Sequence, residues 1–112
     1  MSHRWITGAI VGLGLVVALA AVPPRVLPQD RAEQGRREFM QQGCHGCHTV
    51  QRLGTPIGPD LSRIGAKYSE SYLKAWLRDP AQQRPTAHMP KLELTDAQIA
   101  VLAAFLASLN SR

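Results

Sequence analysis

The stretch Gly43-Cys44-His45-Gly46-Cys47-His48 holds both cysteines of this 112-residue chain, three positions apart, with a histidine directly after the second. A disulfide between them would close a tiny loop, and the stabilisation that a disulfide gives grows with the length of the loop. A redox pair of the thioredoxin kind needs βαβ surroundings, which this sequence does not predict. A zinc site would need two further ligands, and the spacing of His48 and His88 matches no usual Cys2His2 pattern.

Covalent attachment of a haem is the use for which C-x-x-C-H is the known signature. Positions i, i+3 and i+4 of a helical turn share one face, and Cys44, Cys47 and His48 occupy those positions. Both thiols can therefore bond to the vinyl groups of one porphyrin edge while the imidazole lies under the iron. We predict one covalent haem c, with His48 as the proximal ligand. His45, between the cysteines, is expected to face solvent.

A six-coordinate haem needs a second axial ligand, and a methionine thioether in that place raises the reduction potential. The chain has three methionines. Met1 initiates the chain, and Met40 lies one turn before the first cysteine, on the attachment side, where core packing is expected. Met89 comes 41 residues after His48, in the segment HMPKL. We predict that Met89 is the distal metal ligand, with its neighbour His88 as the competitor.

The N-terminal segment predicts export from the cytoplasm. The 18 residues from Trp5 to Val22 carry no charge, and a helix needs about 17 to 25 apolar residues to span a bilayer. Residues 18–20 read Ala-Leu-Ala, which is also a usable signal-peptide cleavage site. We favour a retained transmembrane anchor over residues 1–22, with a haem domain in the periplasm. Cleavage would instead leave a soluble periplasmic protein.

Residues 23–29 are rich in proline and predict a semi-stiff linker. Residues 30–112 then form the haem domain, which reads as all-α with about three to four helices and no run long enough for a strand. Asp30-x-x-Glu33 predicts the start of a helix over residues 31–42, which Gly43 ends. Ser69 predicts the start of a second helix, which Pro80 ends. Thr95-x-x-Gln98 predicts the start of a third, whose apolar stripe consists of Ile99, Leu102, Ala103, Leu106 and Leu109. Residues 53–61 and 82–94 are expected to be loops.

Over about residues 30–109 the chain resembles the class I c-type cytochromes. The residues that carry the resemblance are QGRREFMQQGCHGCHTV, IGPDLSRIGAKY, HMPKL and the closing helix. The resemblance implies a class I cytochrome c fold around one haem. It also implies that the first and last helices cross closely through Gly35, Phe39 and Phe105.

The resemblance further assigns three residues to the haem environment. The carbonyl of Pro59, in GPDL, is expected to accept a hydrogen bond from the proximal histidine, because a metal-bound histidine usually donates its other ring N–H. Trp76 and Tyr68 are the candidates for a hydrogen bond to a haem propionate, with plain core packing as the alternative for each.

The function implied is that of an electron carrier rather than an enzyme, working between membrane respiratory or photosynthetic redox complexes, with lipid contact through the N-terminal helix. The alternatives are a fixed haem subunit of a larger membrane oxidoreductase, or a five-coordinate haem enzyme or gas sensor, against which Met89 counts. The net charge of +5, from 13 Lys+Arg and 8 Asp+Glu, suits an acidic partner or anionic lipid. Because the basic residues are scattered, no nucleic acid is expected, and filled axial positions leave no site for a small-molecule substrate.

Overall fold

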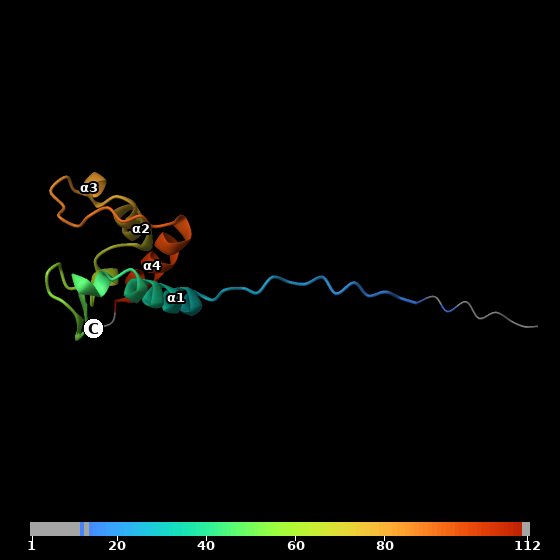
Figure 1. The fold of residues 1–112 in the computed structure, drawn as a ribbon. Coiled ribbons are helices and arrows are strands. Elements are labelled where there is room, and N and C mark those ends of the chain that lie inside the picture. The colour runs from blue at the N-terminus through green and yellow to red at the C-terminus, as the bar shows by residue number, and fades with distance from the viewer. Residues whose placement is uncertain (1–11, 13, 111–112) are drawn as a thin grey trace, which may run out of the picture.

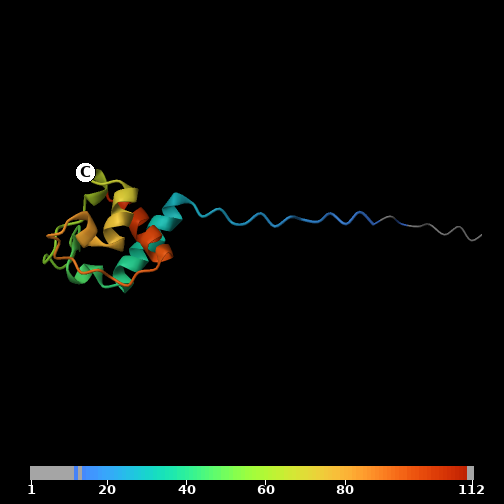
Figure 2. The ribbon, with the colours of Figure 1, turned by 90° about the horizontal axis from the view of Figure 1, so that it is seen from above.

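The computed structural model describes residue 12 and residues 14–110 of the chain. Residues 14–27 contain neither helix nor strand and run away from the folded part as extended chain (Figures 1 and 2). The predicted anchor over residues 1–22 lies partly outside the described residues. Within residue 12 and residues 14–110, no helix has the length and apolar character needed to cross a membrane.

The described residues contain four α-helices, two short 3-10 helices and one small hairpin. The α-helices are α1 (Pro28–Gln41), α2 (Glu70–Arg78), α3 (Pro80–Gln83) and α4 (Asp96–Ser108). The 3-10 helices are η1 (Cys44–Gly46) and η2 (Ile64–Ala66), and the strands are β1 (Thr49–Val50) and β2 (Leu53–Gly54). The folded part is therefore mainly helical, as predicted.

Helix α1 begins at Pro28, inside the segment predicted to be a linker, so the expected start at residue 31 is wrong. A proline suits the first helical position because its fixed φ is helical and its missing N–H would have no partner there. The Asp30 carboxylate lies one turn further on and accepts a hydrogen bond from the Leu27 N–H at 3.3 Å. Asp30 therefore lies in the first turn of α1 and caps the helix from there, whereas the sequence predicted it as the residue before the helix.

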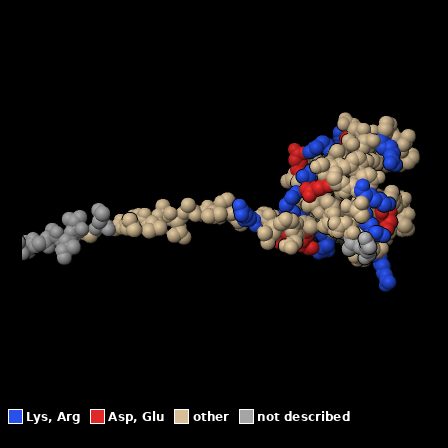
Figure 3. Space-filling model, turned by 180° about the vertical axis from the view of Figure 1, so that it is seen from behind, with Lys and Arg blue, Asp and Glu red and all other residues tan. Residues whose placement is uncertain are grey.

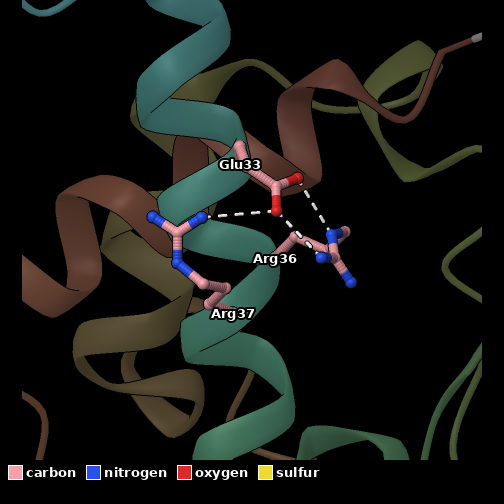
Figure 4. Close-up of polar contacts among 3 residues, drawn as sticks. All are labelled: Glu33, Arg36 and Arg37. Carbon is pink, nitrogen blue, oxygen red and sulfur yellow. Dashed lines mark hydrogen bonds and ion pairs between the residues drawn. The ribbon is translucent and has the colours of Figure 1, made fainter.

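Glu33 does not help to cap α1 but pairs with two arginines on the exposed face of the helix (Figure 4). Its carboxylate accepts hydrogen bonds from Arg36 at 2.8 and 2.9 Å and from Arg37 at 3.3 Å. The hydrogen bond from Arg36, together with the charges of both arginines, holds the pKa of Glu33 below its usual value. On the face of the molecule seen in Figure 3, Lys and Arg likewise stand among Asp and Glu.

The starts of α2 and α4 are confirmed. The Ser69 hydroxyl accepts a hydrogen bond from the Tyr72 N–H at 3.2 Å. At α4, the Thr95 hydroxyl accepts from the Gln98 N–H at 3.2 Å, and the Gln98 side chain accepts from the Thr95 N–H at 2.9 Å. Helix α2 ends before Pro80 as expected, but this proline then opens α3, which extends into the segment predicted to be a loop.

The core forms where α1 crosses α4, as the resemblance implied. Gly35 is buried at the crossing, and a Cβ there would collide with the carbonyl oxygen of Val101 and lie 2.6 Å from the Cβ of Phe105. Phe39 and Phe105 meet edge to face, with ring centroids 5.6 Å apart. Met40, expected in the core, is 43% exposed. The core residues are Phe39, Leu73, Leu77, Ile99, Leu102, Ala103, Phe105 and Leu106.

A partly buried charge network ties α2 to α1 and α4. The Glu70 carboxylate lies 3.1 Å from Arg31 and 3.1 Å from Lys74. Arg31 also donates to the carbonyl of Ala100 in α4 at 3.5 Å. Partial burial raises the pKa of Glu70, but the hydrogen bonds from Lys74 and Arg31 outweigh it and leave that pKa below its usual value.

The antiparallel hairpin of β1 and β2 follows His48 directly and was not expected. Thr49 pairs with Gly54, and Val50 pairs with Leu53. Two-residue strands are too short to show the alternation by which strands are recognised in a sequence. Gln51 in the turn has φ 56° and Gly54 in β2 has φ 109°, and a Cβ on Gly54 would collide with the carbonyl oxygen of His48. The hairpin thus turns the chain back over the residues that carry the cysteines.

Candidate functional site

The two cysteines and the histidine share one helical turn. Gly43 ends α1 in the left-handed conformation, at φ 74°, and η1 begins directly after it. The carbonyl of Cys44 accepts the N–H groups of Cys47 at 3.2 Å and of His48 at 3.0 Å. The spacing i, i+3, i+4 therefore has the helical geometry that the sequence predicted. The two cysteines form no disulfide with each other.

The environments of the two thiols differ. Cys44 is half-buried and packs against the edge of the core, whereas Cys47 is exposed. Burial raises the pKa of the Cys44 thiol, and the nearby Glu38 carboxylate acts in the same direction.

The imidazole of His48 is oriented by the carbonyl oxygen of Pro59, which lies 2.8 Å from Nδ1. A carbonyl oxygen can only accept a hydrogen bond, so Nδ1 must carry the proton and donate it. The other ring nitrogen, Nε2, then keeps its lone pair. This is the arrangement that a metal-bound histidine adopts, because the second hydrogen bond fixes both the tautomer and the orientation of the ring.

Gly58 leaves the space in which this ring lies. A Cβ on Gly58 would come within 2.7 Å of Cε1 and 2.9 Å of Nδ1 of His48. The N–H of the same residue donates to the carbonyl of Cys47 at 2.6 Å, and the N–H of Ile57 donates to it at 3.1 Å. The loop before Pro59 is thus bound to the cysteine turn by its backbone and packs against the imidazole.

A second link runs beside the one between His48 and Pro59. Thr49, the next residue after His48, donates its hydroxyl proton to Asp60, the next residue after Pro59, at 3.0 Å. The Ser62 hydroxyl and backbone N–H donate to the same carboxylate oxygen at 2.7 and 3.1 Å. These hydrogen bonds from Ser62, and then the one from Thr49, hold the pKa of Asp60 below its usual value. Asp60 therefore fixes the segment that presents the Pro59 carbonyl.

Met89 lies in the irregular segment between α3 and α4, half-buried against the core. Its neighbour His88 is exposed. The sulfur of Met89 accepts a hydrogen bond from the indole N–H of Trp76 at 3.2 Å. Of the two residues considered for the distal position, Met89 is therefore the one held inside the fold.

The two aromatic residues assigned to a propionate have different surroundings. The indole N–H of Trp76 is directed at the Met89 sulfur. Tyr68 stacks on Tyr72, with centroids 4.6 Å apart and rings at 18°, and is 37% exposed. Within the described part of the chain, no hydrogen bond joins Tyr68 to the other predicted site residues. The structure thus pairs His48 with Pro59 and Trp76 with Met89, and leaves Tyr68 apart.

Two residues of the site were not foreseen. The role of Gly58 was missed, although it stands directly before the proline in GPDL, where a close approach of the backbone could have been suspected. His45 was expected to face solvent but is half-buried, and its Nδ1 is buried without a hydrogen-bond partner among the described residues. The backbone of the following loop reaches it, because the N–H of Thr55 donates to the carbonyl of His45 at 3.0 Å.

These residues fit a covalently bound haem. Two cysteines that form no disulfide lie on one turn, and an imidazole beside them has its Nδ1 bonded and its Nε2 available. A half-buried thioether is present in the segment before α4. Histidine nitrogen and methionine sulfur are a known axial pair for haem iron in electron-transfer proteins.

Comparison with known proteins agrees with this reading of the site. Cytochrome c oxidase subunit 2 of Alkalihalophilus pseudofirmus is 36% identical over 88 residues, which cover 70% of this chain and 26% of that protein. The chain thus spans about a quarter of that relative's length. Cytochrome c-551 of Bacillus subtilis is 28% identical over 106 residues, covering 87% of this chain and 89% of that one. The family model described as "Cytochrome c" matches residues 32–110. This chain therefore belongs to the cytochrome c family and is an electron-transfer haem protein with covalently bound haem c.

Proposed function

We propose that this protein is a single-haem electron carrier in which His48 and Met89 fill both axial positions of the iron. The observation that carries the proposal is the position of Met89, half-buried against the core beside the exposed His88. The haem supplies one-electron redox chemistry when it is bound. With both axial positions filled by the protein, the iron offers no place to a substrate.

Each site residue has a distinct task in this proposal. Cys44 and Cys47 hold the macrocycle through thioethers. His48 binds the iron through Nε2, because its Nδ1–H is already donated to the Pro59 carbonyl at 2.8 Å. Met89 supplies a neutral, soft sulfur, which favours the ferrous state over the ferric state and so gives a relatively high potential.

The attachment is tested on a denaturing gel stained for haem. Colour should run with the polypeptide in the wild-type protein, and Cys44→Ala combined with Cys47→Ala should abolish it. Haem stain that migrates apart from the wild-type protein band would contradict attachment through the two cysteines.

The distal ligand is tested with Met89→Ala. We expect the variant to lose the sulfur-to-iron charge-transfer band in the near-red region of the oxidised spectrum. The reduced variant should also bind carbon monoxide at neutral pH. Because His88 could replace the lost ligand, the same measurements are made on the double variant His88→Ala, Met89→Ala.

The matched control is Met40→Ala, since Met40 is 43% exposed and packs outside the core. This variant should keep both the near-red band and the resistance to carbon monoxide. The distal assignment fails if the wild type lacks the band or if Met89→Ala retains it.

We further propose that a retained N-terminal segment holds the carrier at the membrane, with the haem domain on the periplasmic side. The support is the uncharged stretch from Trp5 to Val22, followed by Pro23 and Pro24. Membrane redox complexes are then the electron donor and acceptor. Fractionation of cells followed by N-terminal sequencing of the protein tests this: we expect an intact N-terminus in the membrane fraction, whereas a start at Ala21 or nearby in the soluble fraction would contradict the proposal.

The similarity to oxidase subunit 2 favours a second candidate, a fixed haem subunit of a larger membrane oxidoreductase. Against it stands the match to cytochrome c-551, which covers 89% of that cytochrome, whereas the match to the oxidase subunit covers 26%. Purification in mild detergent separates the two candidates. A carrier comes away alone, while a subunit stays with its complex in a fixed ratio.

A further inference from the structure

We infer that Thr49 and Asp60 are positioning residues for the proximal ligand: their side-chain hydrogen bond fixes which carbonyl faces the His48 imidazole, and how closely, and so helps to set the reduction potential. The inference rests on the proposed function, in which His48 binds the iron, and is independent of the distal ligand. Thr49 and Asp60 act on the iron only through His48.

The first support is a constant offset between two segments of the chain. Four hydrogen bonds between residues 47–51 and residues 58–62 join positions that are eleven apart in the sequence. They pair Cys47 with Gly58, His48 with Pro59, Thr49 with Asp60, and Gln51 with Ser62. Because both members of each pair rise together along the chain, the two segments run side by side in the same direction. The bond from His48 to the Pro59 carbonyl is therefore one contact in a common register.

The second support is a gap in the backbone hydrogen bonds that hold this register. The N–H of Gly58 donates to Cys47 at 2.6 Å, and the N–H of Leu61 donates to Thr49 at 2.8 Å. Between them, Pro59 has no N–H to donate. Within the described part of the chain, the N–H of Asp60 makes no hydrogen bond to another backbone group. At the position that presents the carbonyl to His48, the Asp60 side chain supplies the contact that the backbone does not.

The third support is the number of donors that meet at one oxygen of Asp60. Its Oδ1 accepts the Thr49 hydroxyl at 3.0 Å, the Ser62 hydroxyl at 2.7 Å and the Ser62 N–H at 3.1 Å. The Ser62 hydroxyl in turn accepts the N–H of Gln51, the residue with φ 56°. Hydrogen bonds to an ionised carboxylate are stronger than those between neutral groups. Asp60 thus fixes its own segment through Ser62 and reaches across to Thr49.

The consequence for the iron follows from the proton on Nδ1 of His48. A metal-bound histidine that donates this proton in a hydrogen bond becomes a more basic ligand. A more basic imidazole stabilises ferric iron more than ferrous iron, so a short bond to the Pro59 carbonyl lowers the potential. Without the bond between Thr49 and Asp60, the carbonyl can move away from Nδ1 and the potential rises.

The test is Thr49→Val in the holoprotein, which keeps the shape of the side chain and removes its hydroxyl. We expect the ferrous-to-ferric ratio at a fixed ambient potential to rise about threefold, since one such hydrogen bond is a modest interaction. At 59 mV per tenfold for one electron, this raises the potential by about 30 mV. In the NMR spectrum of the ferrous protein, the Nδ1–H proton of His48 should move upfield and exchange faster with solvent, because its hydrogen bond is longer.

Two further threonine variants control for the loss of a hydroxyl and for a change of side-chain shape. Thr55→Val makes the same change in the same loop, at an exposed threonine whose hydroxyl makes no hydrogen bond within the described residues. It should leave the potential and the Nδ1–H signal of His48 unchanged. Thr49→Ser keeps a hydroxyl at the site and should return both measurements towards the wild-type values.

Variants of Asp60 separate position from charge. Asp60→Asn removes the charge but keeps a side-chain oxygen that Thr49 and Ser62 can reach, so the Nδ1–H signal of His48 should stay in place. Asp60→Ala removes that oxygen as well and should move the signal as Thr49→Val does. An unchanged signal in Asp60→Ala would contradict the role given to this side chain.

Two results with Thr49→Val would overturn the inference and leave iron binding by His48 standing. An unchanged potential and Nδ1–H signal would show that backbone hydrogen bonds alone hold the Pro59 carbonyl. Equal changes in Thr49→Val and Thr55→Val would show a general loosening of the loop. A separate measurement tests the ligand itself, because the haem ring current shifts the ring protons of an iron-bound imidazole far upfield in the ferrous protein. If the His48 ring protons of the wild type lack this shift, the proximal assignment fails, and the inference fails with it.

Discussion

The two candidate iron ligands of this protein stand on segments that are built in different ways. The segment around His48 is held by backbone hydrogen bonds to the cysteine turn, by the Pro59 carbonyl and by the Thr49–Asp60 bond. The segment around Met89 has no helix or strand; it is linked to α2 by Trp76, and to Asp79, the residue after α2, by the ion pair from Lys91.

This contrast shows which of the two ligands the protein fold holds more firmly. The imidazole has its orientation set by neighbours that belong to the same stretch of chain, so the protein's own hydrogen bonds fix this side. Segments held by few contacts open at a lower free energy than the core. We therefore expect the Met89 side to be the one that opens first and that determines exchange with outside ligands.

The largest loss of stability is expected at the crossing of α1 and α4, because the His48 segment and the Met89 segment both depend on it. Gly35→Ala places a Cβ against the backbone of Val101, which cannot move without separating α1 from α4. Overpacking of this kind costs about 3 kcal/mol, and both ligand segments should lose their order together. Thermal unfolding followed by far-UV circular dichroism measures the loss. Gln34→Ala, one position away and exposed, is the control and should unfold as the wild type does.

A smaller effect is expected from Gly58→Ala, which acts on the His48 side alone. The added Cβ would lie 2.7 Å from Cε1 of His48, so the ring has to shift away from the Pro59 carbonyl. We expect a loss of about 1 to 3 kcal/mol in stability and a changed low-spin signal in the electron paramagnetic resonance of the ferric protein.

The control for this variant is Gly46→Ala, because a Cβ on Gly46 meets nothing within 4 Å. If Gly58→Ala keeps the wild-type spectrum and stability, the imidazole does not need the space at Gly58. The His48 segment would then be held less firmly, relative to the Met89 segment, than we infer.

The smallest effect is expected from Asp60→Asn, and it should depend on pH. The folded-state pKa of Asp60 lies below its usual value of 3.8, so its contribution to stability is present above that value. This contribution is lost as the pH falls through the lower folded-state pKa. The wild type should therefore be more stable than the variant at pH 7, and the difference should shrink in acid. A difference in melting temperature between the wild type and Asp60→Asn that stays constant down to pH 3 would contradict this prediction.

The parts that the sequence predicted well are those set by chemistry between near neighbours. The cysteine turn needs one fixed spacing, and the caps at Ser69 and Thr95 act over three residues. The glycine–aromatic crossing of Gly35, Phe39 and Phe105 followed from the resemblance, since it joins residues far apart in the chain.

The parts that the sequence did not predict depend on contacts between segments. The space at Gly58 exists only because the loop folds onto His48, and the burial of His45 depends on the same loop. The start of α1 at Pro28 was missed because a proline-rich stretch also reads as a linker. The bond from Trp76 to Met89 joins two segments whose approach no local pattern specifies.

The crossing of α1 and α4 has a consequence for the order in which the protein can fold. Five of the eight core residues, from Ile99 to Leu106, belong to α4, the last helix of the described residues. A chain that emerges with its N-terminus first therefore has no core to close until α4 has emerged. The cysteine turn is made long before that moment. The thiol of Cys44, half-buried in the finished fold, is thus accessible to a haem for as long as α4 has not packed against α1.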